Sequence, residues 1–255
     1  MSGPGVTLRP RLAKLALLVA LALGGQFVAR WIAGRYVVGL SSRAQDASLM
    51  FEWLVLACVP LGWFAAPTLS ISPTPLLDRW MRREPAGSEF NRALYRSLVL
   101  VAISLGAGML LLMFPHLHTQ SGDATLNTPI PLPYAMLLAV VAPFREEVEF
   151  RLGLLTLLAW ILFQLMRPAL GARTRPALAI ANLMQAMLFG ALHQLAGFTG
   201  RTATLSLVGV MLEPRTLSGV VFGYGYIRYG LEVAIMTHMM FDGAISAAGA
   251  IFPRT

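Results

Sequence analysis

Long apolar stretches recur along the whole chain, and most of them approach the length of a membrane-crossing helix. A helix needs about 20 consecutive apolar residues to cross the hydrocarbon core of a bilayer. The stretches cover residues 12–33, 50–72, 94–114, 132–166, 177–197, 203–228 and 231–252. In hydrocarbon the backbone must satisfy its own hydrogen bonds, which a helix does within one segment. The sequence therefore predicts an all-α, polytopic membrane bundle of seven to eight transmembrane helices.

The overall composition supports this class. Of the 255 residues, 56% are hydrophobic and only 13% are charged, with a mean hydropathy of +0.66, whereas soluble domains carry about 25% charged residues. The first stretch follows Arg9, Arg11 and Lys14, as a secretory signal would. Its hydrophobicity continues past Ala29 without a convincing cleavage site, so we expect an uncleaved helix.

The net charge of +8 is spread over several connections rather than gathered in one patch, so we expect no nucleic-acid partner. Two connections are rich in arginine: Arg79, Arg82, Arg83, Arg92 and Arg96 in one, and Arg167, Arg173 and Arg175 in the other. The connection 116–131 has no Lys or Arg. The positive-inside rule then places the N-terminus and the arginine-rich connections in the cytoplasm, and 116–131 outside. Arg30, Arg35 and Arg43 fall on the outer side and count against this orientation.

This orientation requires residues 132–166 to cross the membrane once, as a kinked or broken helix. The segment 72–92, rich in Pro, Gly and charge, is predicted to hold a short helix on the cytoplasmic surface. No repeat or interdomain linker stands out, so we interpret residues 1–255 as a single membrane domain. We expect an integral, multi-pass protein of the bacterial inner (cytoplasmic) membrane.

The stretch FREEVEFRLG places five charges in seven residues directly after an apolar run. Each ionised side chain near the bilayer centre costs about 2.5–3.5 kcal/mol, so these charges must face protein, water or each other. Pro143 suits a first helical turn, so we expect a helix to start there. Glu147 and Arg151 are four residues apart and are predicted to pair, which leaves Glu146 for chemistry. The alternative is a solvated, purely structural helix start.

Two later apolar segments also carry polar faces. Asn182, Gln185, Phe189 and His193 follow steps of three, four and four, and His238 and Asp242 are four apart; each set therefore lies on one side of a helix. A lone histidine on an apolar helix is more often a hydrogen-bonded core residue than a catalyst. Three separate apolar segments nevertheless carry ionisable residues: Glu146 in the first, His193 in the second, and His238 with Asp242 in the third. An internal polar cavity would give all of these side chains water or polar partners.

The order of these motifs resembles the CAAX prenyl endopeptidase and bacteriocin-processing family (CPBP, or Abi) of intramembrane proteases. Its EExxxR motif is met by Glu146, Glu147 and Arg151; its FxxxH motif by Phe189 and His193; and its HxxxN or HxxxD motif by His238 and Asp242. The segment GVVFGYGYIRYG is similar to the family's glycine-containing segment, with Gly219 and Gly223 at close-packing spacing. The resemblance covers residues 132–252, which would carry the catalytic core.

The resemblance implies an intramembrane glutamic endopeptidase that needs no cofactor and no metal. Glu146, as general base, and His193 would hold and activate a water, while His238 and Asp242 would stabilise the oxyanion. Glu147, Arg151 and Phe189 would support the site. The expected partners are the lipid bilayer and a membrane-associated protein or peptide substrate: a CAAX-type C-terminus, a leader or bacteriocin peptide, or a C-terminal sorting tail.

Three alternatives stay open at this point. The same protease could use zinc, because two histidines, a glutamate and water would make an open tetrahedral site, although HExxH is absent. The chain could instead be a non-catalytic immunity or scaffold protein. It could also be a proton-coupled transporter, which predicts corresponding broken helices in two halves, and we find no such internal symmetry.

The role assigned to Asp242 depends on its protonation state, because an ionised carboxylate would repel an oxyanion. At ~4 Å and an effective dielectric constant of 20 that repulsion is about 4 kcal/mol. Asp242 would therefore either donate as a neutral acid or orient a donor such as His238. We favour direct donation.

Overall fold

The computed structural model describes residues 8–36, 42–85, 87–112, 130–197, 210–211 and 214–251. All regular elements in these ranges are helical. They are α1 (Leu8–Tyr36), α2 (Ser42–Ala65), η1 (Ala66–Leu69), α3 (Pro75–Met81), α4 (Gly87–Leu112), α5 (Leu132–Glu147), η3 (Val148–Leu155), α6 (Thr156–Leu170), α7 (Arg175–Gly197), α9 (Pro214–Tyr229) and α10 (Leu231–Ile251). The prediction of an all-α chain is confirmed for this part of the protein.

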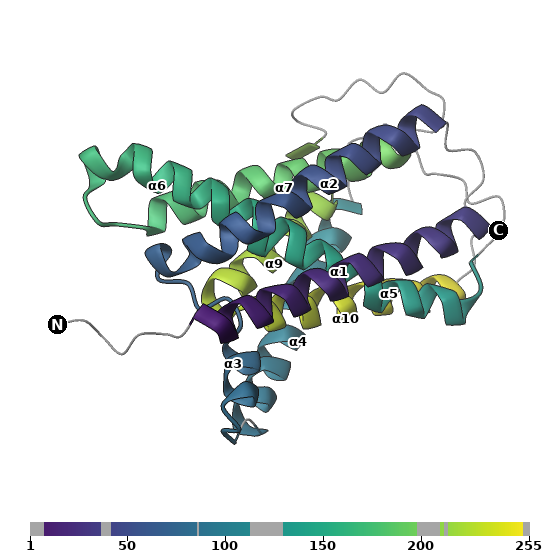
Figure 1. Cartoon of the computed structure of the whole chain (residues 1–255). Coiled ribbons are helices and arrows are strands. Elements are labelled where there is room, and N and C mark those ends of the chain that lie inside the picture. The colour runs from purple at the N-terminus through teal and green to yellow at the C-terminus, as the bar shows by residue number, and fades with distance from the viewer. Residues whose placement is uncertain are drawn as a thin grey trace.

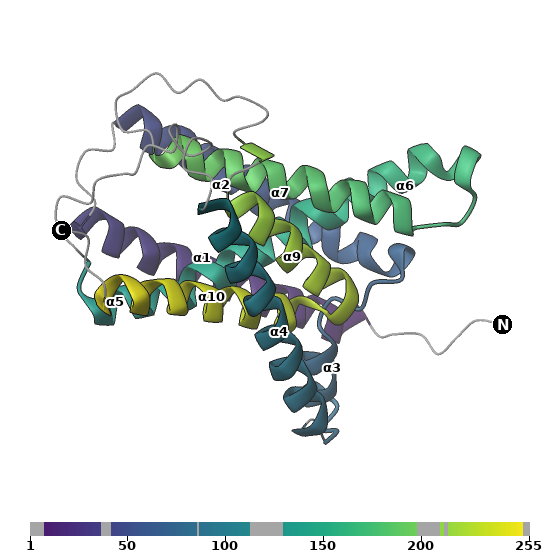
Figure 2. The same cartoon turned by 180° about the vertical axis from the view of Figure 1, so that it is seen from behind.

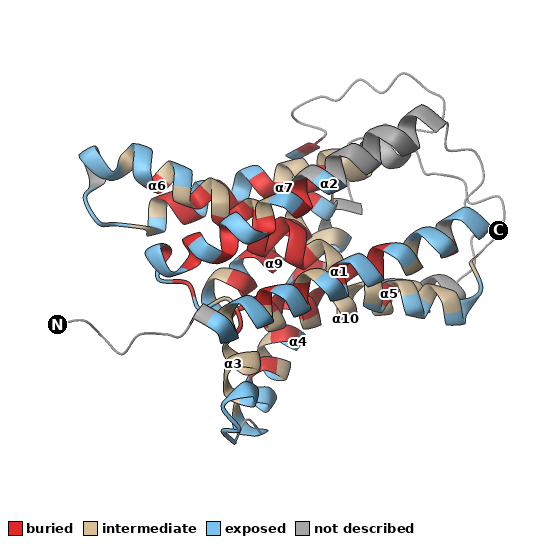
Figure 3. Cartoon of the chain, in the orientation of Figure 1, coloured by how far each residue is buried: buried red, intermediate tan, exposed pale blue. Residues whose placement is uncertain are grey.

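The helices form two groups that share one core (Figure 1). In one group α5 lies between α1 and α10, and in the other α2 and α7 flank α6. Seen from behind, α4 and α9 cross the bundle obliquely and pack against α10 (Figure 2). Buried residues gather in the middle of the bundle, whereas most of α3 is half-buried and its last residues, Trp80 and Met81, are exposed (Figure 3). The largest apolar cluster there joins side chains of α1, α2, η3, α6, α7, α9 and α10.

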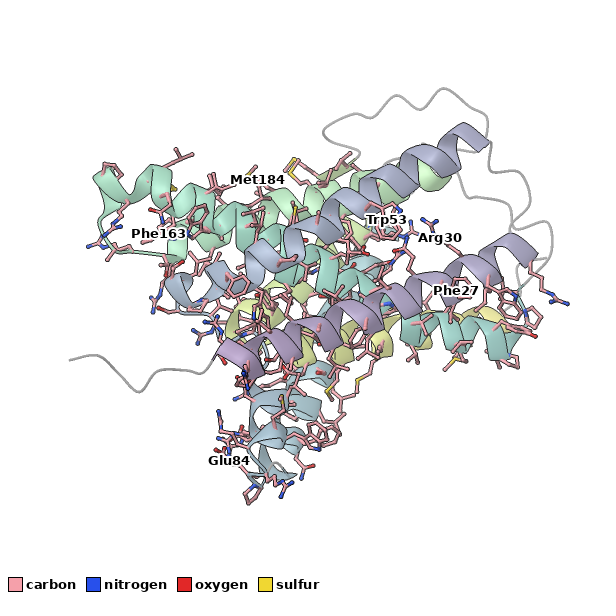
Figure 4. All side chains as sticks on the ribbon, in the orientation of Figure 1. Phe27, Arg30, Trp53, Glu84, Phe163 and Met184 are labelled. Carbon is pink, nitrogen blue, oxygen red and sulfur yellow. The ribbon has the colours of Figure 1, made fainter. Side chains whose placement is uncertain are left out.

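Four of the described helices are long and apolar enough to cross a membrane: Arg9–Ile32, Gly87–Met109, Leu132–Ala169 and Arg175–His193. The apolar helical stretch Val55–Leu69 is shorter. Large apolar side chains on the outside, such as Phe27 and Trp53, labelled in Figure 4, are 76% and 55% exposed, as lipid contact requires. The chain is a polytopic helical membrane protein. The finer expectation of seven to eight crossing helices stays a prediction, and most of residues 203–213 lie outside the described ranges.

One continuous helix runs from α5 through η3 into α6, as a single crossing of residues 132–166 requires. The expected kink or break is instead a π-helical segment, Val148–Leu155. Such wide turns occur mostly within α-helices and often at functional sites.

The prediction of a helix start at Pro143 is wrong. Pro143 lies inside α5, which begins at Leu132. A helix that began in mid-membrane would leave its first N–H groups without partners in a medium that offers none. The apolar run before Pro143 therefore belongs to the same helix, and the adjacent glutamates lie at the end of α5 rather than in a first helical turn.

The short helix predicted in segment 72–92 is confirmed as α3, and its position on the cytoplasmic surface stays a prediction. Its first turn is fixed by α10, because Glu232 Oε1 accepts hydrogen bonds from the N–H groups of Leu76 (3.0 Å) and Leu77 (2.9 Å). The Leu231 N–H also donates to the Pro73 carbonyl at 2.7 Å. These bonds hold α3 against the α9–α10 turn, where Gly230 has a φ of 99° that favours glycine.

Candidate active site

The charged stretch lies in the middle of the bundle, at the junction of α5 and η3. Glu146 and Glu147 are the last residues of α5, and Glu149 and Arg151 belong to η3. The side chains of Glu147 and Arg151 have no exposed area, and that of Glu149 is 1% exposed. The interpretation of this stretch as a solvated helix start is therefore wrong, because these charges face protein.

The predicted pair of Glu147 and Arg151 is confirmed. Glu147 Oε2 lies 3.1 Å from Arg151 Nε. The guanidinium carbon lies 5.0 Å from the ring centroid of Phe189 and 5.8 Å from that of Phe222. Two aromatic faces and one carboxylate thus compensate for the burial of Arg151. The pair joins η3 to α7 and α9.

Glu147 has a second partner that the sequence did not predict. Its Oε1 lies 2.8 Å from Nδ1 of His238 on α10, so the imidazole donates its Nδ1 proton to the carboxylate. The ring of Phe222 stacks on the same imidazole, with centroids 4.5 Å apart and an interplanar angle of 29°. These contacts fix the ring plane of His238 and direct its Nε2 away from Glu147.

Nε2 of His238 faces two further carboxylates. Glu146 Oε2 lies 3.9 Å away and Asp242 Oδ1 lies 3.7 Å away. Both distances exceed a direct hydrogen bond and suit a bridging water. The side chain of Asp242 is 35% exposed, whereas those of Glu146 and His238 are 12% and 6% exposed. The predicted helical face of His238 and Asp242 is therefore confirmed, with Asp242 at its more open edge.

Glu146 is flanked by two basic groups. Its Oε1 accepts a hydrogen bond from Arg145 Nη2 at 3.3 Å, and it interacts electrostatically with His193 on α7. Arg145 also lies 3.9 Å from Glu149 through its Nε. The sequence indicated the charge of Arg145 but not its position between these two carboxylates.

His193 has a defined tautomer. Its Nδ1 lies 2.8 Å from the carbonyl oxygen of Phe189, one helical turn earlier. A carbonyl can only accept, so Nδ1 carries the proton, and Nε2 of the neutral ring keeps a lone pair that can accept from water or bind a metal. The two rings are tilted with centroids 4.4 Å apart. Phe189 therefore supports His193 through both its ring and its backbone.

The polar face predicted on α7 divides into two parts. Its first half binds α9: Asn182 Nδ2 donates to the Val220 carbonyl at 3.0 Å, and Gln185 Nε2 to the Gly219 carbonyl at 3.3 Å. The close-packing prediction for the glycines is confirmed, since a Cβ added to Gly223 would lie 1.9 Å from Asn182 Oδ1. The second half reaches the charged residues, because Phe189 packs on Arg151 and His193 interacts electrostatically with Glu146.

The sequence missed two residues at the edge of this cluster. Phe222 lies in the glycine-containing segment, which was interpreted only for its glycines. Arg215, in the first turn of α9, interacts electrostatically with His193 and Asp242. Neither has a local sequence signal, because both act on residues of other helices.

Residues 128–244 match the family model of the type II CAAX prenyl endopeptidase Rce1-like proteins. The matched region begins just before α5 and ends within α10. It therefore contains all of Glu146, Glu147, His193 and His238, which we call the Glu and His cluster. This part of the chain is an Rce1-like CAAX prenyl endopeptidase domain. A comparison with curated proteins and one with solved structures found no match.

The Rce1-like family is a peptidase family, and membership implies that the substrate of this domain is a protein. The sequence-based resemblance to CAAX proteases is confirmed, and a buried cluster of Glu and His is consistent with the active site of such a peptidase. Within the described residues, no three His, Cys, Asp or Glu side chains are grouped in a way that could hold a metal ion.

Proposed function

We propose that the chain is an intramembrane endopeptidase that hydrolyses a peptide bond of a membrane-associated protein or peptide. One observation carries the proposal: inside the Rce1-like domain, Glu146 of α5 lies 3.9 Å from Nε2 of His238 on α10 and interacts electrostatically with His193 of α7. The side chains of Glu146 and His238 are only 12% and 6% exposed. A carboxylate and two imidazoles in a poorly hydrated site suit general acid–base catalysis.

In the proposed reaction Glu146 is the general base. A water lies between Glu146 and Nε2 of His193, which accepts one of its hydrogen bonds. Glu146 takes a proton from this water as its oxygen attacks the carbonyl carbon of the substrate. The C–N bond then breaks, and the same carboxyl group returns the proton to the leaving amine.

On the other side of the carbonyl, His238 and Asp242 stabilise the developing negative charge. Glu147 accepts a hydrogen bond from Nδ1 of His238 and holds Nε2 toward the site, 3.9 Å from Glu146. This arrangement supports an imidazolium that donates from Nε2 to the oxyanion. Asp242, as a neutral acid, donates the second hydrogen bond. Groups of this kind contribute about 3–4 kcal/mol each to transition-state stabilisation.

The substrate classes that fit the proposal share a terminus close to the bilayer. They are a CAAX-type C-terminus, a leader or bacteriocin peptide, and a C-terminal sorting tail, in the bacterial inner membrane. The test compares the membrane proteome of a deletion strain with that of a strain carrying Glu146→Ala, by sequencing protein termini. The same proteins should keep an extra terminal segment in both strains and lose it when wild-type protein is restored. If no terminus changes in either strain, the proposal fails.

A zinc-dependent peptidase is the second candidate. The Nε2 lone pair of His193 can bind a metal as well as water, although the described residues hold no group of three ligands for it. The two mechanisms differ in their response to a strong chelator. The glutamate mechanism predicts that purified protein keeps its activity in excess chelator. Full inhibition that zinc alone restores would replace it with the metal mechanism.

A further inference from the structure

A second polar region lies away from the Glu and His cluster, where α3 and α4 meet the α9–α10 turn. It is a cavity of about 340 Å³. Its lining is Ser70, Ser72, Pro75, Leu76, Arg79, Glu89, Ala93, Arg96, Ile227, Arg228, Tyr229, Gly230 and Val233. We call it the basic pocket, because three arginines line it and Glu89 is the only acidic residue in the lining.

The one carboxylate of the basic pocket is already shared. Glu89 Oε1 lies 3.1 Å from Arg92 Nη2 and 3.7 Å from Arg79 Nη2. The guanidinium of Arg96 lies 4.5 Å from the ring centroid of Tyr229. In the described ranges, neither Arg96 nor Arg228 is within ion-pair distance of a carboxylate.

Two further acidic side chains lie near the pocket, and one oxygen of Glu232, Oε2, is buried without a hydrogen-bond partner. Glu232 Oε1 accepts two backbone N–H groups of α3, and Asp78 pairs with Lys14. With three arginines and one carboxylate in its lining, the basic pocket keeps an excess of positive charge. Guanidinium groups bind phosphate oxygens in pairs of charge-assisted hydrogen bonds, so the pocket suits a phosphate.

The surroundings of the pocket indicate its depth in the membrane. Trp80, Phe90 and Tyr95 on α3 and α4 are 70%, 50% and 70% exposed, and aromatic residues are enriched where membrane meets water. Glu84, at the α3–α4 connection, projects from the outer tip of this region (Figure 4). The candidate membrane span of α4 begins at Gly87. The pocket thus lies at the level of the lipid head groups.

Beyond the pocket, α4 presents apolar side chains outward. Leu98, Val99 and Ile103 are 53%, 42% and 52% exposed, which suits contact with acyl chains. The positive-inside rule assigns this arginine-rich connection to the cytoplasmic leaflet, where anionic lipids attract basic residues. A phosphate attached to acyl chains would therefore satisfy both the arginines and the apolar side of α4.

We propose that the basic pocket binds the phosphate of an anionic phospholipid, with Arg96 and Arg228 as its main ligands and the acyl chains along α4. The bound head group would connect α3, α4 and the α9–α10 turn. His238 follows Val233, a lining residue, by five positions on α10. The lipid would in this way support the helix that carries part of the Glu and His cluster.

Lipid binding to the purified full chain tests the proposal without any activity measurement. Native mass spectrometry in mild detergent would titrate phosphatidylglycerol and phosphatidylcholine separately. The pocket variant is R96Q/R228Q, and R173Q/R175Q is the matched control, with the same charge change on the α6–α7 connection. At about 1 kcal/mol per arginine, the pocket variant should bind phosphatidylglycerol about 30-fold more weakly. The control and the affinity for phosphatidylcholine should change little.

Equal affinities of the wild type for the two lipids, or equal losses in the two double variants, would overturn the proposal. If R96Q/R228Q does not fold, the single variant R228Q replaces it, since Arg228 is exposed. A second measurement distinguishes a lipid phosphate from a soluble one. Glycerol 3-phosphate, added at the same concentration as phosphatidylglycerol, should not displace the bound lipid. Displacement at equal concentration would mean that the pocket serves a soluble phosphate, and the lipid assignment would be wrong.

Discussion

Replacing Glu146 by Gln is the most direct test of the proposed chemistry, because Gln keeps the shape of the side chain and removes the base. Its amide oxygen can still accept the bond that Glu146 Oε1 accepts from Arg145 at 3.3 Å. General acid–base catalysis contributes about 10²–10⁴-fold. The variant should therefore lose about 10²–10⁴-fold in kcat/KM, or about 2.7–5.5 kcal/mol of transition-state stabilisation.

Glu149→Gln is the matched control. Both glutamates lie near Arg145, at 3.3 Å and 3.9 Å. At an effective dielectric constant of 20 their gross attractions to it are about 5 and 4 kcal/mol. Each variant therefore removes a similar electrostatic attraction to Arg145. Of these two glutamates, Glu146 is the one 3.9 Å from Nε2 of His238, so its variant should lose the chemical step and Glu149→Gln should not.

The assay uses protein reconstituted in proteoliposomes and a quenched fluorescent peptide that spans a cleavage site found by terminal sequencing. Thermal unfolding of each purified variant reports folding separately from turnover. The reasoning is refuted if Glu146→Gln, correctly folded, cleaves within tenfold of the wild-type rate. It is also refuted if Glu149→Gln loses as much activity as Glu146→Gln.

Three further changes test the support of the site. Arg151→Met should cost about 3–5 kcal/mol of stability, because it leaves Glu147 buried without the guanidinium that it pairs with. Adding Glu147→Gln should restore most of the melting temperature. Activity should stay at least tenfold below wild type, since His238 then loses the carboxylate that holds it. Gly223→Ala should cost about 1–3 kcal/mol of stability, because the added methyl group would clash with the side-chain amide of Asn182 on α7. Gly106→Ala is its control: no atom lies within 4 Å of the added methyl group, so the melting temperature should not fall. Asp242→Asn should keep most activity and extend it to higher pH, because an amide donates where a carboxylic acid would ionise; a tenfold loss in folded protein would instead mean that its charge is needed.

The local spacing of residues was enough to predict much of the site. Pairs four apart on one helix, such as Glu147 with Arg151 and His238 with Asp242, share a face whatever surrounds the helix. The length and apolarity of the stretches likewise determine that the chain is helical and crosses a membrane, because lipid leaves the backbone few alternatives. The prediction of a helix start at Pro143 failed because it considered only the preference of proline for a first helical turn. It left out the lipid around the segment, in which a helix cannot begin without unpaired N–H groups.

The contacts between helices were decided only by the tertiary structure. Glu147 and His238 are 91 residues apart, and nothing in their spacing says that Glu147 serves both Arg151 and the imidazole. That contact depends on the rotation and separation of whole helices, which close approaches such as that of Gly223 to α7 set. The sequence alone determined a helical membrane peptidase with its charges on defined helical faces. Packing across helices decided which charges meet, because a residue's face is a local property and its partner is not.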